Sequence, residues 1–368
     1  MVSAFAIPAA VLARAARVAA GLPVDVDIPE LLTGRAALLD LPAPGRMSAG
    51  GASRLLRARD GWCALTLSRP DDLAAVPALL EADHIDADPW PAIGDWLADR
   101  SADTAVARAR LLGMPAAMLA EAAPAQPVVQ RITTQAPPRP WTDLLVIELA
   151  SMWAGPLLGR MLVRAGATVV KVESLARPDG TRRGSPEFFD WMNGGKHCIT
   201  VDFDDATQLG ALLAAADMVI EGSRPAALAR RGLGPDVVPA RDGRVWVRIT
   251  GHGTVAERAD WVAFGDDAAV AGGLVGAAAD GPVFVGDAIA DPLTGLEAMH
   301  AVVESLHRGG GELVEVSMAA VAAGYAALPD EGTAEVAARA PALGPPTAHL
   351  GADNATVRAL VERRLAAC

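Results

Sequence analysis

Cysteine is scarce in this sequence, and the few cysteines lie far apart. Cys63, Cys198 and Cys368 form no CxxC pair. Without such spacing, neither a disulfide framework nor a zinc site is expected, and the composition fits a reducing compartment. We therefore expect no structural metal ion and a cytoplasmic location.

Basic charge and long apolar runs are lacking as well. The formal net charge is −12 and the sequence pI is about 5.0, so the basic field that a nucleic-acid partner requires is missing. No uncharged apolar run reaches the roughly 18 residues of a membrane span. Arg14 and Arg17 also interrupt the stretch where a signal peptide would need an uncharged core. Neither nucleic acid nor a membrane is expected as a partner, whereas a few local cations could hold a polyanionic small ligand.

Aromatic residues make up only 4% of the chain, although hydrophobic residues reach 52%. The core must therefore be built mainly from Ala, Val and Leu, and a disordered chain is not expected. The 368 residues suffice for two domains of ordinary size.

The first part of the chain has the pattern of a small α+β domain over residues 1–122. A flexible segment around Gly50 and Gly51 precedes a turn at Asp60-Gly61. A strand is predicted over 62–68, and helices over 11–20, 73–81, 93–97 and 104–111. Residues 123–140 are rich in Pro and Gln and predict a linker, and residues 331–368 predict a connector and a last helix.

Residues 141–330 alternate between apolar strands and helices, which is typical of a parallel α/β domain. The predicted strands include 144–150, 168–173, 198–202, 218–221 and 245–250. We predict an α/β fold with a doubly wound, mostly parallel sheet in a Rossmann-like large domain, beside the smaller α+β domain. Ligands of such sheets bind at the carboxyl ends of strands, here residues 150–156, 173–181 and 221–225.

Five strings in the large domain resemble, in order, those of the family III CoA-transferases, which include formyl-CoA transferase, carnitine CoA-transferase and α-methylacyl-CoA racemase. They are AGPLLGRMLVRAGATVVKVE, PDGTRRG, NGGKHCITVD, ADMVIEGSRPAALARRGLG and the run from Val285 to Met318. The resemblance covers residues 140–320. It implies an enzyme whose substrates are a coenzyme A thioester and a carboxylic acid, with no tightly bound cofactor, and it implies an interlocked homodimer.

The remaining segments resemble the same family in a different order. Residues 47–115 resemble the small domain that normally follows the segment with the nucleophile, but here they precede the first strand of the large domain. Residues 346–361 resemble the usual C-terminal tail. The resemblance therefore implies a permuted arrangement of small domain, large domain and tail.

Asp291 is the strongest catalytic candidate. It stands before Pro292 in IADPLTG, and this pattern alone favours an N-cap with proline at the first helical position. The resemblance instead assigns the nucleophilic carboxylate to this position. A carboxylate is already ionised at neutral pH and needs no general base, so it could attack a thioester to give an aspartyl anhydride and then an aspartyl-CoA thioester.

Two glycine-containing segments are candidates to enclose the reacting groups. Gly50 and Gly51 resemble the family's glycine loop, although an ordinary flexible linker explains them nearly as well. Ala154, Gly155 and Pro156 follow a strand and would bring backbone close to the thioester. Trp153 stands where formyl-CoA transferase has Gln, which indicates a bulkier acyl group than formate or oxalate.

The resemblance places further residues near the coenzyme. Arg182, Lys196 and Arg230 are candidates for the phosphates or the adenine, although each could equally be a solvated surface cation. Arg177 is a candidate to replace the family's basic residue, because Ser174 occupies its usual place, and Ser223 lies where the family packs the adenine. The remaining candidate is Asp266, which lies in Gly265-Asp266-Asp267, the counterpart of the racemases' Gly-His-Asp.

Three alternatives to CoA transfer follow from the same residues. Without a histidine beside Asp266 a racemase is disfavoured, because its proton transfer needs two bases. A degenerate acyl-CoA-binding protein is the more serious alternative, given the departures at Trp153, Ser174 and Ser223. A nicotinamide-dependent oxidoreductase would need a GxGxxG turn, which the sequence ASMWAGPLLG lacks.

Overall fold

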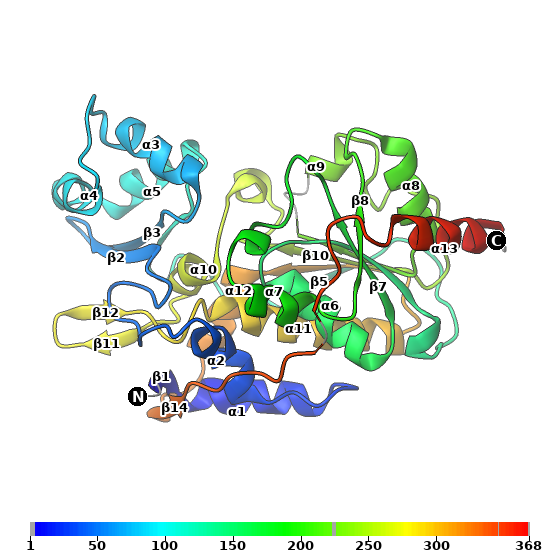
Figure 1. Ribbon diagram of the computed structural model, residues 1–368. Helices are drawn as coiled ribbons and strands as arrows, with labels where there is room; N and C mark the ends of the chain where they lie inside the picture. Colours follow the sequence, from blue (N-terminus) through cyan, green and yellow to red (C-terminus); the bar gives the residue numbers. More distant parts are fainter. Residues whose placement is uncertain (1–3, 223–225, 345, 367–368) are drawn as a thin grey trace.

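The computed structural model describes residues 4–222, 226–344 and 346–366. Its centre is a seven-stranded sheet whose strands run parallel except for one edge strand. From edge to edge the strands are β5 (Val128–Arg131), β13 (Glu312–Ser317), β10 (Val245–Thr250), β9 (Met218–Glu221), β6 (Leu145–Leu149), β7 (Thr168–Glu173) and β8 (His197–Thr200). The predicted mostly parallel α/β sheet is confirmed (Figure 1).

The order of the parallel strands is that of the Rossmann fold. Along the chain they follow as β6, β7, β8, β9, β10 and β13, but in the sheet β6 lies beside β9. From β6 the chain first adds β7 and β8 toward one edge of the sheet. It then returns to β9 and adds β10 and β13 toward the other edge. At such a switch point the loops that leave the two strands diverge and open a crevice for a ligand. Here the crevice is expected where the chain leaves Leu149 and Glu221.

Helices cover both faces of the sheet, because successive strand residues point to opposite sides. Val146 belongs to one hydrophobic core and Ile147 to the other. The first core is covered by α6 (Ala154–Ala165) and α11 (Ala290–His307), and the second by α8 (Ala206–Ala215) and α13 (Asn354–Ala366). The strands are thus buried on both faces, which explains their continuous apolar sequences.

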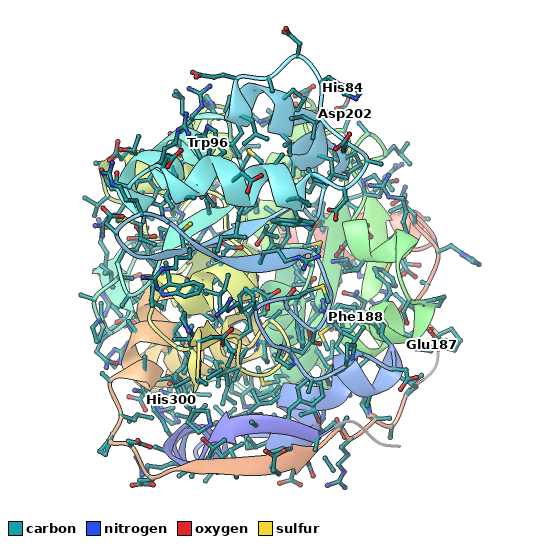
Figure 2. The ribbon with its side chains drawn as sticks, turned by 90° about the vertical axis from the view of Figure 1, so that its left-hand side faces the viewer. His84, Trp96, Glu187, Phe188, Asp202 and His300 are labelled. Carbon is teal, nitrogen blue, oxygen red and sulfur yellow. The ribbon has the colours of Figure 1, made fainter. Side chains whose placement is uncertain are left out.

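A small domain with its own hydrophobic core lies beside the large one. Its antiparallel strands are β2 (Ser53–Arg57), β3 (Trp62–Thr66) and β4 (Ala116–Met118), and its helices are α3 (Pro70–Leu80), α4 (Trp90–Ala98) and α5 (Ala102–Leu111). Val76, Ile93 and Val106 form part of its buried cluster. Figure 2 shows this unit, with Trp96 and His84, at the top of the molecule.

The elements within residues 4–38 pack on the large domain, although the sequence pattern assigned them to the small one. Phe5, Ile7 and Leu32 are fully buried in the core that contains α6 and α11. They lie in β1 (Ala4–Pro8) and α2 (Ile28–Leu38), with α1 (Ala9–Ala20) between, and β1 pairs with β14 (Thr333–Ala337). The small domain therefore begins at the segment before β2, because the apolar faces of these helices are buried by the large domain.

The predicted linker and the C-terminal segment are likewise joined to the sheet. Part of the linker forms β5, the antiparallel edge strand, which pairs with β13. At the start of β9 the buried Asp217 forms ion pairs with Arg139 of the linker, Arg241 and Arg364 of α13. One carboxylate thus connects three segments that are far apart in the sequence.

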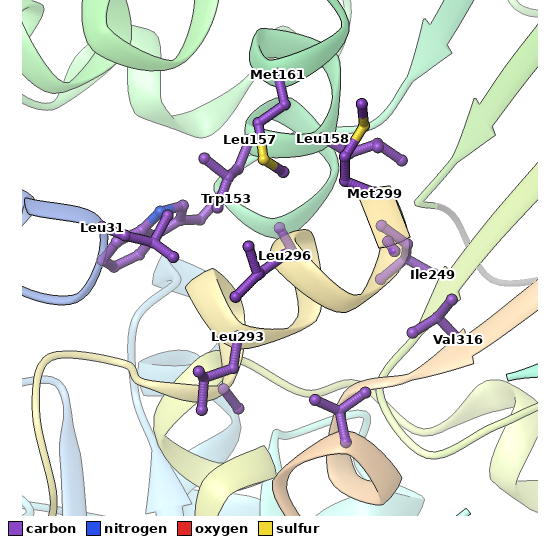
Figure 3. Close-up of a cluster of buried hydrophobic side chains, with 14 of the residues drawn as sticks. Leu31, Trp153, Leu157, Leu158, Met161, Ile249, Leu293, Leu296, Met299 and Val316 are labelled. Carbon is purple, nitrogen blue, oxygen red and sulfur yellow. The ribbon is translucent and has the colours of Figure 1, made fainter. Parts of the chain in front are cut away.

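Helices α6 and α11 pack very closely. A Cβ atom built on Gly295 would lie 2.7 Å from Leu157 and 3.0 Å from the carbonyl oxygen of Ala154. Figure 3 shows the leucine and methionine side chains of the two helices facing each other around this contact. Because α11 begins with the segment that contains Asp291, the close contact places Asp291 beside the first residues of α6.

The remaining elements lie at several places around the sheet. They are α7 (Pro186–Asn193), α9 (Ala226–Ala229), α10 (Gly265–Ala271), α12 (Met318–Ala326), the hairpin β11 (Gly276–Ala278) and β12 (Gly281–Val283), and short 3-10 turns at Trp141–Asp143, Gly180–Arg183 and Ala256–Asp260. None of the helices in the described part of the chain combines the length and the apolar character needed to cross a bilayer.

A fully buried group of charges lies beneath the carboxyl ends of β6 and β7. Glu148 pairs with Lys171 at 3.3 Å and with Lys196 at 2.7 Å, and Lys171 also pairs with Asp179 at 2.8 Å. Burial lowers the pKa of Lys196 to about 8, although Glu148 opposes this change. Glu148 is thus the carboxylate that the two lysines share, and it is the ion-pair partner of Lys196.

We expect Glu148→Gln to lower the free energy of unfolding by about 3–5 kcal/mol, because it leaves buried lysines without their shared counter-charge. Urea unfolding at pH 7 measures the change. Asp204→Asn is the matched control, since Asp204 pairs with Arg231 on the surface and should change the free energy by less than about 1 kcal/mol. Equal effects of the two substitutions would contradict a role of Glu148 in neutralising the lysines.

Candidate active site

Asp291 lies in the first turn of α11 but does not cap it. The N-cap residue is Ile289, which provides no capping side chain, and the backbone N–H of Asp291 donates to Ala288 at 2.9 Å. Ala288 adopts φ 44°, a left-handed conformation that is costly for alanine. The capping explanation of the Asp291-Pro292 pair is therefore wrong, and the carboxylate points elsewhere.

The carboxylate of Asp291 lies against the first turn of α10. A Cβ atom on Gly265 would come within 2.5 Å of Oδ2 of Asp291, so only glycine fits at that position. The side chain is half-buried. Burial raises its pKa to about 7, Asp266 adds to the increase, and Arg35 together with the backbone of Gly265 and Ala154 counteracts it. Asp291 can therefore exist in both protonation states near neutral pH.

Arg35 is the cation of this site, and it comes from α2. Its Nε and Nη2 donate to the two oxygens of the fully buried Asp287, at 2.8 and 2.6 Å. The guanidinium also lies over the ring of Trp153, 5.1 Å from its centroid. The sequence analysis missed Arg35, although it is the one charged residue in the run from Leu31 to Leu39. A lone arginine in an apolar helix was the available signal.

Two further carboxylates begin α10 and contact the small domain. Asp266 accepts from the Ser53 hydroxyl at 3.0 Å and from the N–H of Ala288 at 3.1 Å. The fully buried Asp267 accepts from the Thr66 hydroxyl and from the N–H of Phe264, each at 3.0 Å. Asp266, which the family resemblance singled out, therefore lies at the site, and its pKa is raised by burial and by Asp287.

The glycine loop lies next to Arg35. Gly50 is exposed, and a Cβ atom there would be 2.9 Å from Nη2 of Arg35. Gly51 has φ 78°, and its N–H donates to the carbonyl oxygen of Ser48 at 2.9 Å in a closed turn. The loop is thus an ordered turn at the site rather than an extended linker.

Residues 153–156 form the other side of the site. Ala154, Gly155 and Pro156 are buried in the first turn of α6, at the switch point of the sheet. Trp153 is only 2% exposed and packs edge-to-face on Phe188, with ring centroids 5.2 Å apart. Trp153 therefore supports the guanidinium of Arg35 from behind and offers little surface to a ligand.

The structure does not gather the cations that the resemblance placed near the coenzyme. Lys196 is buried in the charge group around Glu148, and Arg182 pairs with Glu173 at 2.6 Å and stacks on Phe189. Arg177 and Arg230 are exposed side chains. Ser223 lies outside the described residues. Lys196 and Arg182 are thus committed to ion pairs inside the protein, which a sequence pattern does not reveal.

The fold and the site thus define an α/β protein whose doubly wound sheet carries an acidic site at its switch point. A glycine turn from a second domain covers the site, and its half-buried carboxylate has a raised pKa. The profile of CoA-transferase family III matches residues 142–344, more than half of the chain. The chain belongs to this family.

The chain is also similar in sequence to individual proteins that are named CoA-transferases. The chain is 29% identical over 205 residues to succinyl-CoA–D-citramalate CoA-transferase of Chloroflexus aurantiacus, covering 51% of each sequence. It is 28% identical to succinate–glutarate CoA-transferase of Agrobacterium fabrum, covering 49% of the chain and 51% of the relative, and 28% identical to human succinyl-CoA:glutarate CoA-transferase, covering 46% and 42%. The chain spans about half the length of these curated relatives.

Solved structures of similar sequence were also found. A CaiB/BaiF family protein of Brucella suis is 29% identical, with a TM-score of 0.47 over 52% of this chain and 56% of that one. The Rv3272 protein of Mycobacterium tuberculosis is 29% identical, with a TM-score of 0.45 over 51% and 56%.

We expect Asp291→Asn to stabilise the protein at pH 8 by about 1–4 kcal/mol. The folded chain holds the Asp291 proton up to a pH of about 7, whereas the unfolded chain releases it near pH 4. Stability therefore falls as the pH rises through this window, and the neutral amide removes the loss. Urea unfolding at pH 8 and pH 4 measures the gain, which should vanish at pH 4.

The exposed Asp83→Asn is the control for this stability measurement. It should change the free energy of unfolding by less than about 0.5 kcal/mol at either pH. A loss of stability in Asp291→Asn at pH 8 would show that the folded state does not disfavour the ionised Asp291.

Proposed function

We propose that this protein transfers coenzyme A between an acyl-CoA and a carboxylic acid, with Asp291 as the covalent nucleophile. The observation that carries the proposal is the position of Asp291. In a member of CoA-transferase family III, a half-buried carboxylate lies between the first turns of α6 and α10, beside a glycine turn and one arginine.

The reaction needs four substitutions at carbonyl carbon. An oxygen of Asp291 attacks the thioester, the C–S bond breaks, and CoA leaves as a thiolate from a mixed anhydride. The thiolate attacks the aspartyl carbonyl and releases the donor acid, which leaves an aspartyl-CoA thioester. The acceptor carboxylate attacks this thioester to give a second anhydride and the thiolate. The thiolate then attacks the acceptor's acyl carbon, which forms the new thioester and regenerates Asp291.

Three features of the chain support these steps. Arg35 favours the ionised form of Asp291, which is the nucleophile. The N-terminus of α6 carries the partial positive charge that stabilises an oxyanion, and backbone N–H groups there have no partner within the helix. The turn at Gly50 and Gly51 would limit access of water to the anhydride and the thioester.

The location of the glycine turn bears on the assembly. Gly50 lies beside Arg35 of the same chain, so turn and nucleophile belong to one subunit. We propose a homodimer, as the resemblance implies, in which each chain provides its own turn. We also propose a cytoplasmic location. A succinyl thioester is the first donor to test, because several relatives carry succinyl-CoA or succinate in their names.

Trapping the acyl-enzyme tests the proposal directly. The protein is incubated with succinyl-CoA and a panel of bulkier acyl-CoA esters, then treated with hydroxylamine, and its peptides are weighed by mass spectrometry. We expect a hydroxamate on Asp291, because both the anhydride and the aspartyl thioester react with hydroxylamine. The donors that produce it identify the acyl group.

Two variants make the trapping experiment decisive. Asp291→Asn should give no hydroxamate, and Asp83→Asn should behave like the wild type. Binding of CoA esters without hydroxamate on any donor would favour a non-catalytic acyl-CoA-binding protein. Exchange of the α-proton of a bound acyl-CoA without CoA transfer would favour a racemase-type isomerase.

The yield of hydroxamate in a single turnover should rise with pH through about 7, the pKa of Asp291. Only the ionised carboxylate attacks the thioester, so the yield at short times follows the ionised fraction. Quenched reactions between about pH 6 and about pH 8 measure this dependence. A yield that stays constant over this range would mean that Asp291 is already ionised.

A further inference from the structure

Four oxygen-bearing side chains form a continuous line across the contact between α10 and the small domain. Oδ1 of Asp267 lies 3.0 Å from the Thr66 hydroxyl, which lies 2.9 Å from the Ser53 hydroxyl, which lies 3.0 Å from Oδ2 of Asp266. Thr66, Ser53 and Asp267 are buried, and Asp266 is half-buried at the site that contains Asp291. The line therefore runs from the interior to the active site.

If each contact in this line is a hydrogen bond, the line holds one proton more than its two hydroxyls supply. It contains three oxygen–oxygen contacts at hydrogen-bond distance, and each needs one hydrogen. The hydroxyls of Thr66 and Ser53 supply one hydrogen each. The backbone N–H groups of Phe264 and Ala288 bind the outer carboxylates and take no part in the three contacts. The third hydrogen must be a proton on Asp267 or Asp266.

The surroundings of the two carboxylates place this proton on Asp267 at rest. Oδ2 of Asp267 is buried and has no hydrogen-bond partner among the described residues, an arrangement that is costly for an ionised carboxylate. Burial raises the pKa of Asp267 to about 8. Burial and Asp287 raise the pKa of Asp266 as well. Unlike Asp267, however, Asp266 accepts a hydrogen bond at each oxygen, from the Ser53 hydroxyl and the N–H of Ala288, and it faces the Arg35 guanidinium.

We infer that Asp267, Thr66, Ser53 and Asp266 form a proton relay that ends beside Asp291. Asp267 gives its proton to the Thr66 oxygen, the Thr66 hydroxyl proton passes to Ser53, and the Ser53 proton passes to Asp266. Three O–H bonds break and three form, so one proton moves and no co-reactant is needed. The catalytic consequence of the relay rests on the proposed function of Asp291. The proton shared along the relay does not depend on that function.

The relay would control the charge next to the nucleophile. The groups facing Asp266 are Arg35 of α2, Asp287 and Asp291 of the segment that begins α11, and Ser48 and Ser53 of the glycine turn and β2. Asp266 repels Asp291 while it is ionised, so arrival of the proton removes that repulsion and favours the ionised Asp291. Both hydroxyls belong to the small domain, so the relay requires that domain to be seated on α10.

Infrared spectroscopy tests the position of the proton without any need for activity. The wild type minus Asp267→Asn difference spectrum at pH 7 should contain the C=O band of a protonated carboxyl group. Thr66→Val should shift this band to higher frequency, because the carboxyl group loses its hydrogen-bond acceptor, and Thr66→Ser should leave it unshifted. Absence of the band, or equal bands in Thr66→Val and Thr66→Ser, would overturn the shared proton.

Steady-state kinetics with a donor identified by trapping test the transfer. Thr66→Val should lower kcat by at least about tenfold with little change in KM, since proton transfer by positioned groups contributes about this much or more. Thr66→Ser should restore kcat. The matched control is Thr294→Val, because the buried Thr294 hydroxyl has no hydrogen-bond partner among the described residues. Equal kcat values for Thr66→Val and Thr66→Ser would overturn the relay.

The two experiments separate this inference from the proposed function. If the wild type is inactive but shows the band of a protonated carboxyl group, the CoA-transfer proposal is wrong and the shared proton is supported. An active wild type without the band would confirm CoA transfer and overturn the relay.

Discussion

The site depends on how closely α11 approaches α6. Gly295 allows the two helices to touch through backbone and leucine side chains, since any Cβ there would overlap Leu157. This contact places Asp291, one turn earlier, beside the N-terminus of α6 and above the switch point of the sheet. Side chains packed at crystal-like density leave little room for adjustment. The position of Asp291 is thus set by core packing rather than by a flexible loop.

Such a position has an electrostatic cost that the surroundings only partly offset. Asp266, Asp267, Asp287 and Asp291 lie within one region, and Arg35 is the cation that faces Asp266, Asp287 and Asp291. Asp287 neutralises Arg35 with a bidentate contact, so the net charge stays negative and the remaining carboxyl groups hold protons more tightly. Keeping buried carboxyl groups protonated costs less free energy than burying several negative charges. The raised pKa values of Asp267 and Asp291 follow from the same constraint.

The N-terminal segment contributes Arg35 to the site, and no motif in its sequence predicts this contribution. Helix α2 packs into the large core and delivers Arg35 to the carboxylates, while Trp153 and Phe188 support the guanidinium. The Gly50 turn then follows within a few residues and reaches the same arginine. The fold thus brings Arg35, the Gly50 turn and Asp291 together within this chain.

Much of the fold was accessible from the sequence, because local patterns determine it. The apolar strands over 168–173, 218–221 and 245–250 and the helix over 206–215 have the predicted bounds. The family resemblance predicted Asp291, and the end of a predicted strand indicated the α6 turn. Edge strand β5 and the pair of β1 with β14 were missed. Strand β5 is short and exposed, and the apolar residues of β1 run directly into those of α1.

The sequence by itself determined the class of fold, the family and the candidate nucleophile, since these depend on periodicity and on short motifs. Only the tertiary structure decided which charges meet. Lys196 appeared to be a ligand cation but is neutralised by Glu148 inside the core, whereas Arg35 lay unnoticed in an apolar helix and reached the site. Whether a charge serves a ligand or the fold depends on partners that are far away in the chain, and spacing along a sequence does not record such distances.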